Sequence, residues 1–162
     1  MKTLEYLQLN DNQTSNVVNS LHGLLADFQV HYTNLRGFHW NIKGRGFFTL
    51  HEKFESMYND TAEKVDEIAE RILTLGGVPE NRYSQYLQQS DVQEVGNVSC
   101  GGEAIKLVLD TYKTLISKER ALIDLATEAN DVVTADLLTG YLKEQEKTVW
   151  MLVAVSSHNC EK

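Results

Sequence analysis

The chain has 162 residues, 42% of them hydrophobic, with a single proline and a formal net charge of −8 at pH 7. Residues 1–162 therefore fit one domain with a substantial core, and the composition is typical of a helical protein with few loops. The acidic charge attracts cations and repels the phosphate backbone of nucleic acids, so DNA binding is not expected.

The first helix is predicted from about Gln13 to Asn41, after a short extended arm over residues 1–10. Its apolar residues recur with a period near 3.6, which is typical of an amphipathic helix. Four nearby side chains could cap its start: Asp11, Asn12, Thr14 and Ser15. Gly44 and Gly46 interrupt the pattern and are predicted to make the first connection.

The second helix is predicted from about Phe47 to Leu75, because Gly76-Gly77 with Pro79 just beyond forms a C-cap followed by a stop. A long connection over residues 78–100 follows, and Tyr83–Gln89 could form a short helix within it.

The third helix is predicted from about Glu103 to Glu128, and the fourth extends to about Ser156 with Asp131 as its cap. Four helices with a long connection between the second and third indicate an all-α crossover bundle of the ferritin-like kind.

A polar seam runs along the second helix. With His51 at zero on a wheel of about 100° per residue, Glu55, Asp66 and Glu70 lie near 40°, 60° and 100°. The seam borders a predicted apolar stripe made of Phe54, Tyr58, Ala62, Val65, Ala69 and Ile72. Carboxylates at such an edge are costly to bury unless they are paired or bind a cation.

Distance along the axis limits what the seam can bind. His51 and Asp66 lie fifteen residues apart, which is about 22 Å at 1.5 Å per residue. One chain cannot bring both to one ion, because metal–ligand bonds are about 2 Å long. Two copies of the helix, antiparallel about a two-fold axis near residues 58–59, would place His51 of each opposite Asp66 of the other. The spacing therefore predicts at least a dimer with metal at its interface.

Three segments resemble the Dps family of mini-ferritins: FHWNIKGRGFFTLHEKFE, VDEIAERILTLGGVP and NDVVTADLLTGYLKEQEKTVWML. The resemblance implies iron ligation by His39 and His51 of one subunit with Asp66 and Glu70 of its two-fold mate. It further implies a hollow shell of twelve subunits that oxidises Fe(II), preferably with hydrogen peroxide, and stores the ferric mineral. The family usually has aspartate where Glu55 stands, so Glu55 is a candidate for a second-iron, bridging or supporting role.

Further roles follow from the same resemblance. Trp40, next to His39, is a candidate sacrificial electron donor, or else an interface packing residue. Asp131 and Asp136 are candidate residues of an acidic iron pore, and the alternative for Asp131 is an N-cap. Zinc is an alternative occupant of the metal site.

Two other functions are alternatives to iron oxidation. A DNA-compacting protein with incidental metal binding would need a basic tail or surface, and an interaction bundle would need no chemistry. The segment HEKFE lacks the second histidine of a zinc protease.

The remaining residues carry less information. The chain has no apolar run long enough to span a bilayer and no signal-peptide core, so cytoplasm is the default location. Cys100 and Cys160 are therefore expected to be free thiols. Three residues are assigned to the core, namely Tyr112, Tyr141 and Trp150, and three histidines receive no role, namely His22, His31 and His158.

Overall fold

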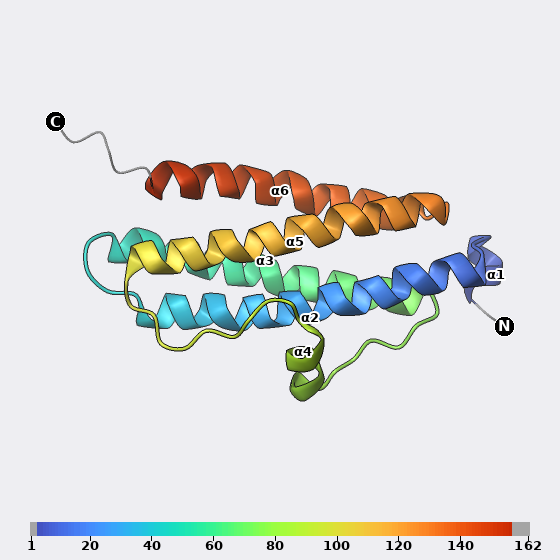
Figure 1. Cartoon of the computed structure of the whole chain (residues 1–162), viewed down its shortest axis with the longest axis horizontal. Helices are drawn as coiled ribbons and strands as arrows, with labels where there is room; N and C mark the ends of the chain where they lie inside the picture. The colour runs from blue at the N-terminus through green and yellow to red at the C-terminus, as the bar shows by residue number, and fades with distance from the viewer. Residues whose placement is uncertain (1–2, 157–162) are drawn as a thin grey trace.

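The structure is a computed structural model that describes residues 3–156. Within this range the chain forms helices α1 (Thr3–Leu7), α2 (Asp11–Asn41), α3 (Phe47–Thr74), α4 (Tyr83–Gln89), α5 (Gly101–Glu128) and α6 (Val132–Ser156). The four long helices form a bundle, and α4 lies beside α2 in the crossover between α3 and α5 (Figure 1). The predicted all-α crossover bundle is confirmed. None of the described helices is long and apolar enough to cross a membrane.

The ends of the helices lie within two residues of the predictions. Helix α2 begins two residues early, because Asn10 caps it: the Asn10 Oδ1 atom accepts hydrogen bonds from Asn12 N at 3.0 Å and Gln13 N at 3.2 Å. The four cap residues proposed from the sequence were therefore wrong. Helix α3 stops where the glycines predicted, with Gly76 at φ 82°, a left-handed conformation that glycine adopts without strain.

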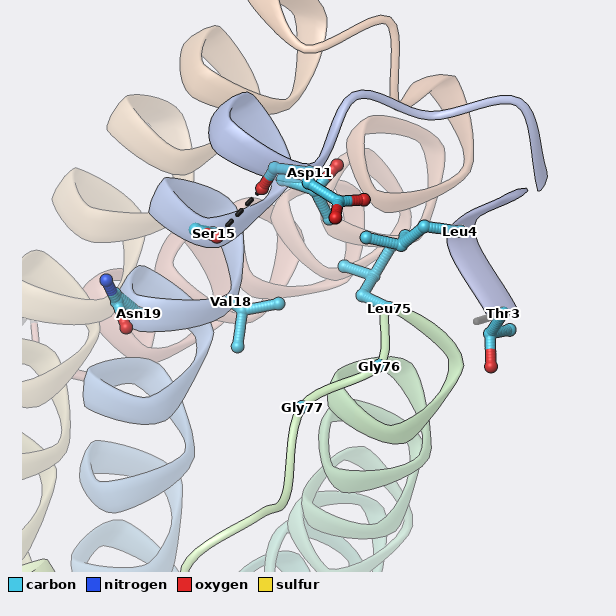
Figure 2. Close-up of a pocket in the computed structure, with 10 residues that line it drawn as sticks. Thr3, Leu4, Asp11, Ser15, Val18, Asn19, Leu75, Gly76 and Gly77 are labelled. Atoms are coloured by element: carbon cyan, nitrogen blue, oxygen red, sulfur yellow. Dashed lines mark hydrogen bonds between the residues drawn. The ribbon is translucent and has the colours of Figure 1, made fainter. Parts of the chain in front are cut away.

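The extended arm predicted for residues 1–10 was wrong over residues 3–7, which form α1. Leu4 of this helix packs against the hydrophobic core, and in Figure 2 its side chain lies beside Leu75 at the end of α3. The backbone closes back on itself, since Leu9 N donates to Leu4 O at 3.3 Å. One apolar contact with the bundle thus stabilises a helix too short to persist alone.

Two buried polar side chains of α2 hold the crossover. Asp27 is fully buried, and its Oδ1 atom accepts from the backbone N–H groups of Asp91 at 2.7 Å and Val92 at 3.2 Å. Asn34 donates to Gln93 O and accepts from Val95 N, each at 2.9 Å. The backbone groups of this irregular segment are thereby satisfied by side chains in place of a helix or sheet.

The core follows the apolar pattern of α5, but it does not follow every prediction made for α6. Six residues at helical spacing along one face of α5 are all buried: Ile105, Val108, Tyr112, Leu115, Leu122 and Ala126. Trp150 was assigned to the core and is instead 67% exposed. It lies nine residues after the buried Tyr141, which is about half a turn away around α6.

Candidate metal centre

Two imidazoles meet where α2 ends and α3 begins. The rings of His39 and His51 are stacked, with centroids 3.8 Å apart and planes 17° from parallel. The Nδ1 atom of His39 lies 2.8 Å from the backbone oxygen of His51, and His51 Nδ1 lies 2.9 Å from the backbone oxygen of His39. Each histidine therefore fixes the ring of the other through the main chain.

These reciprocal bonds set the tautomer of both rings. A backbone carbonyl only accepts hydrogen bonds, so each Nδ1 atom must carry the proton and donate it. In the neutral form of each ring the Nε2 atom then has the lone pair through which imidazole binds a metal. The arrangement thus offers two imidazole nitrogens as metal ligands, with each ring held by a fixed partner.

The connection between the two helices makes this meeting possible. Gly44 and Gly46 both have positive φ, 86° and 84°, and Gly46 directly precedes α3. Lys43 N donates to Ser99 O at 3.0 Å, which ties the turn to the start of α5. This tight turn places the last turn of α2 beside the first turn of α3.

The candidate acidic ligands lie along the exposed side of α3. Glu55, Asp66 and Glu70 are all exposed, and Glu55 accepts a long hydrogen bond of 3.5 Å from the Tyr58 hydroxyl. No group of three or more His, Cys, Asp or Glu side chains within residues 3–156 could hold a metal ion. The histidine pair of a single described chain therefore lacks the carboxylates that an iron site needs.

The apolar stripe predicted on α3 was partly wrong. The buried face consists of Phe54, Met57, Thr61, Lys64, Ile68 and Ile72. The other predicted members turn away from it, with Ala62 exposed and Tyr58, Val65 and Ala69 half-buried. The stripe was placed too far toward the seam because Thr61 and Lys64, both polar, occupy the centre of the buried face.

We call the row formed by Tyr58, Ala62, Val65, Ala69 and Leu73 the apolar flank of α3. Leu73 is 54% exposed at its far end. On the helical wheel the flank lies at the same angle as His51 and next to the acidic residues. An apolar row beside candidate ligands, left open by the chain's own core, is the kind of surface that a second subunit covers.

Trp40 lies next to this region on α2. It is 63% exposed, and the guanidinium carbon of Arg36 lies 4.6 Å from the centroid of its ring. The same guanidinium lies 5.2 Å from the ring of Tyr32. Arg36 thus lies against two aromatic rings on the surface of α2.

The two candidate pore residues differ in environment. Asp131 is buried, accepts from Arg71 Nη2 at 2.6 Å and from Thr134 N at 3.0 Å, and so caps α6 while tying it to α3. Asp136 is exposed and lines a groove of about 320 Å³ between α3 and α6. The cap contacts match the alternative role considered for Asp131.

The bundle interior holds polar groups that the sequence patterns did not reveal. Burial raises the pKa of Glu119 to about 8, although Gln145 Nε2 donates to it at 2.6 Å and Lys64 is nearby. Burial lowers the pKa of His31 to about 3. Each occupies a buried position on a helix face that is otherwise mostly apolar. The hydrophobic pattern of the sequence therefore did not identify them, because it assigns such positions to apolar residues.

Comparisons with known proteins identify the family of the chain. A family model described as a ferritin-like domain matches residues 18–158. A DNA protection during starvation protein of Porphyromonas gingivalis is 53% identical over 156 residues, covering 96% of this chain and 98% of that protein. The crystal structure of the DPS protein of Vibrio cholerae matches with a TM-score of 0.88 and 42% identity, over 90% of this chain and 92% of the other.

Dps from Staphylococcus aureus matches with a TM-score of 0.87 and 34% identity, over 90% of this chain and 97% of that one. The family match spans most of the chain, and the identity to curated relatives is high over nearly their full length. The chain belongs to the Dps family of ferritin-like proteins.

Proposed function

We propose that this protein oxidises Fe(II) at sites shared between two subunits and stores the ferric product inside a hollow homo-oligomeric shell. Membership of the Dps family supports iron storage and protection against oxidative stress. The Vibrio cholerae relative is described as a member of a broad superfamily of ferritin-like diiron-carboxylate proteins. The observation that carries the proposal is the His39–His51 pair, whose tautomers leave both Nε2 atoms available to a metal.

The shared site follows from the geometry of α3. Within the described residues no third candidate ligand completes a metal-binding group with the His39–His51 pair, and Asp66 and Glu70 lie more than ten residues beyond His51 along α3. Two α3 helices packed antiparallel through the apolar flank would place the histidines of one beside the carboxylates of the other. The same packing would cover the exposed apolar residues, which contributes about 25 cal/mol per Å² buried.

Each donor has a role suited to its chemistry. His39 and His51 are neutral ligands, while Asp66 and Glu70 supply negative charge that offsets the ion and favours the ferric product. Glu55, adjacent to this set, would hold a second, more weakly bound iron. Two Fe(II) ions, one hydrogen peroxide and two protons then yield two Fe(III) ions and two waters, so no free radical is released.

Iron needs a route into the shell, and an acidic pore would provide one. The exposed carboxylate of Asp136 is the stronger candidate for an acidic iron pore, while Asp131 caps the start of α6 beside it.

Zinc binds the same imidazole and carboxylate ligands as iron and would compete with iron for the site. A Dps of Listeria innocua has been soaked with zinc in the crystal. The assembly we propose is a dodecamer built from two-fold dimers.

The test is a double-mutant cycle on iron oxidation. The assembled protein is mixed with Fe(II) and hydrogen peroxide, and ferric absorbance is followed for His51→Ala, Asp66→Ala and the pair together. If both residues serve one site, the double variant is little worse than either single variant. Glu63→Ala, an exposed carboxylate on the same helix, is the matched control and should oxidise iron at the normal rate. Losses that multiply in the double variant would contradict a shared site.

A further inference from the structure

Phe47, the first residue of α3, stacks on His51 one turn later in the same helix. The centroids of these two rings lie 5.0 Å apart with their planes 21° from parallel, and the His39 centroid lies 3.8 Å from that of His51. Two rings stacked on the same face of an imidazole would overlap each other, so Phe47 and His39 cover opposite faces of His51. The His51 ring is therefore the middle layer of three stacked rings.

A hydrogen bond fixes the His51 ring within this stack. Its Nδ1 atom lies 2.9 Å from the backbone oxygen of His39, so both faces and one edge of the ring contact the protein. The ring cannot turn about its Cβ–Cγ bond without losing this hydrogen bond and both stacking contacts. The edge that carries Nε2 is the one that these contacts leave available to a metal.

The two histidines depend on Phe47 to different degrees. His39 is buried, and its ring also contacts the Tyr58 ring edge to face. His51 is only half-buried, near the start of α3, where Gly46 has no side chain to cap the helix. Burial in the bundle thus holds His39, whereas the stack with Phe47 supports the face of His51 that His39 does not cover.

Phe47 is itself held in place by the turn and by the core. Its backbone N–H donates to Gly44 O at 3.2 Å, and its half-buried side chain packs against the hydrophobic core. The next residue, Phe48, is 78% exposed, and its ring meets that of Phe47 edge to face. Phe47 can therefore restrain the ring stacked on it, and Phe48 offers a matched comparison one residue away.

We propose that Phe47 is a positioning residue that holds the His51 imidazole in the orientation in which it binds Fe(II). This inference rests on the proposed ferroxidase function, and it concerns how tightly the metal binds before any electron is transferred. A ligand that is already oriented loses little conformational freedom when it binds an ion. Neighbours that orient a metal-binding histidine are typically worth about 10- to 100-fold in metal affinity.

The experiment titrates the assembled full-length protein with Co(II) in the absence of oxidant. Co(II) accepts the same ligands as Fe(II), and its visible absorption reports the coordination. Phe47→Leu, which stays apolar but loses the flat ring, should weaken Co(II) binding by about tenfold. The Fe(II) concentration for half-maximal oxidation should rise by a similar factor, while the rate at saturating iron changes much less. Phe47→Tyr restores the ring and should bind Co(II) as the wild type does.

Phe48→Leu is the matched control and should bind Co(II) with wild-type affinity. Circular dichroism and a sizing column test the folding and assembly of each variant. If Phe47→Leu does not assemble, Phe47→Met takes its place, because methionine fills irregular gaps. Wild-type Co(II) affinity and spectrum in the variant without the ring, or an equal loss in Phe48→Leu, would overturn the positioning role alone. Wild-type protein that neither binds Co(II) nor forms ferric product would defeat the proposed function as well.

Discussion

His31 on α2 and Glu119 on α5 are buried titratable side chains with opposite effects on stability. Neither ring nitrogen of His31 has a hydrogen-bond partner among the described protein atoms, and its pKa falls from 6.5 to about 3 through burial. The pKa of Glu119 rises from 4.5 to about 8 through burial. A protonated Glu119 can donate from Oε2 to Gln145 Oε1, and these are the two atoms of the pair that otherwise lack partners.

The direction in which stability changes with pH depends on whether the folded or the unfolded chain holds the proton. Between pH 6.5 and 3 the unfolded chain protonates His31 and the folded chain does not, so stability falls as pH falls. Between pH 4.5 and 8 the folded chain keeps Glu119 protonated and the unfolded chain does not, so stability falls as pH rises. The two effects oppose each other where the ranges overlap, which predicts a plateau of stability from about pH 4.5 to 6.5.

Replacing Glu119 by glutamine (Glu119→Gln) should stabilise the folded protein at alkaline pH. The groups that face Glu119 are Gln145 on α6, Lys64 on α3 and Tyr112 and Tyr141 on α5 and α6. A glutamine keeps a hydrogen bond to Gln145 and cannot ionise. The gain in unfolding free energy at pH 9 should be up to a few kcal/mol and should vanish near pH 4.

Urea unfolding at a series of pH values measures this effect. The matched control is Glu103→Gln, an exposed position on the same helix, which should leave the pH profile unchanged. An equal shift at every pH would show that Glu119 does not titrate in the way the burial implies.

At the scale of elements, α3 and α6 are joined by one buried ion pair. The Arg71 side chain is 11% exposed and that of Asp131 is 1% exposed, with 2.6 Å between Nη2 and Oδ1. Arg71 Nε also donates to Thr134 Oγ1 at 2.8 Å. Removing one member of such a pair leaves a buried charge without its counterion, which costs about 3–5 kcal/mol.

Asp131→Ala should therefore lower the unfolding free energy by about 3 kcal/mol, measured by urea denaturation. Asp136→Ala, an exposed position one turn further along α6, should leave stability within about 0.5 kcal/mol and slow iron uptake. If Asp131→Ala slows iron uptake while leaving stability intact, Asp131 is a pore residue and its cap contacts are incidental.

The helices themselves could be predicted because their signals are local. Helix α4 has the bounds predicted from its sequence, Tyr83–Gln89, and Gly76 ended α3 as expected. Helix α1 was missed because its stability depends on Leu4 meeting the bundle, which no local pattern encodes. The exposure of Trp150 depends on which side of α6 faces the core, and a period alone does not fix that angle.

The site was predictable in part for the same reason. The spacing of His39 and His51 is a sequence property, but their stacking and reciprocal bonds to main-chain oxygens depend on the turn at Gly44 and Gly46. Tyr58 was assigned to the apolar stripe because its position on the wheel is apolar. Its contact with His39 joins two helices, so only tertiary structure reveals it.

At the scale of the whole molecule, the apolar flank predicts how subunits pair. Ala62 lies near the middle of the flank and is exposed, so Ala62→Glu would place a charge at the centre of the proposed two-fold contact. This variant should elute from a sizing column as a smaller species, keep its helical circular dichroism and lose iron oxidation. Ser56→Glu, an exposed position on α3 outside the flank, is the control and should assemble normally. Normal assembly of Ala62→Glu would place the interface elsewhere.

The charge of the molecule separates iron storage from DNA compaction. The chain has 23 acidic and 15 basic side chains, and residues 1–10 contain only Lys2 as a base. DNA affinity arises mainly from lysine and arginine displacing counterions from phosphates, and the excess of acidic side chains in this chain opposes that contact. The assembled protein should therefore leave linear DNA unshifted in a gel at low salt, whereas its rate of Fe(II) uptake should fall as salt rises, because screening weakens the attraction of cations. Retention of DNA that weakens with salt would reveal a basic surface that forms only on assembly, and it would restore compaction as a second function of this chain.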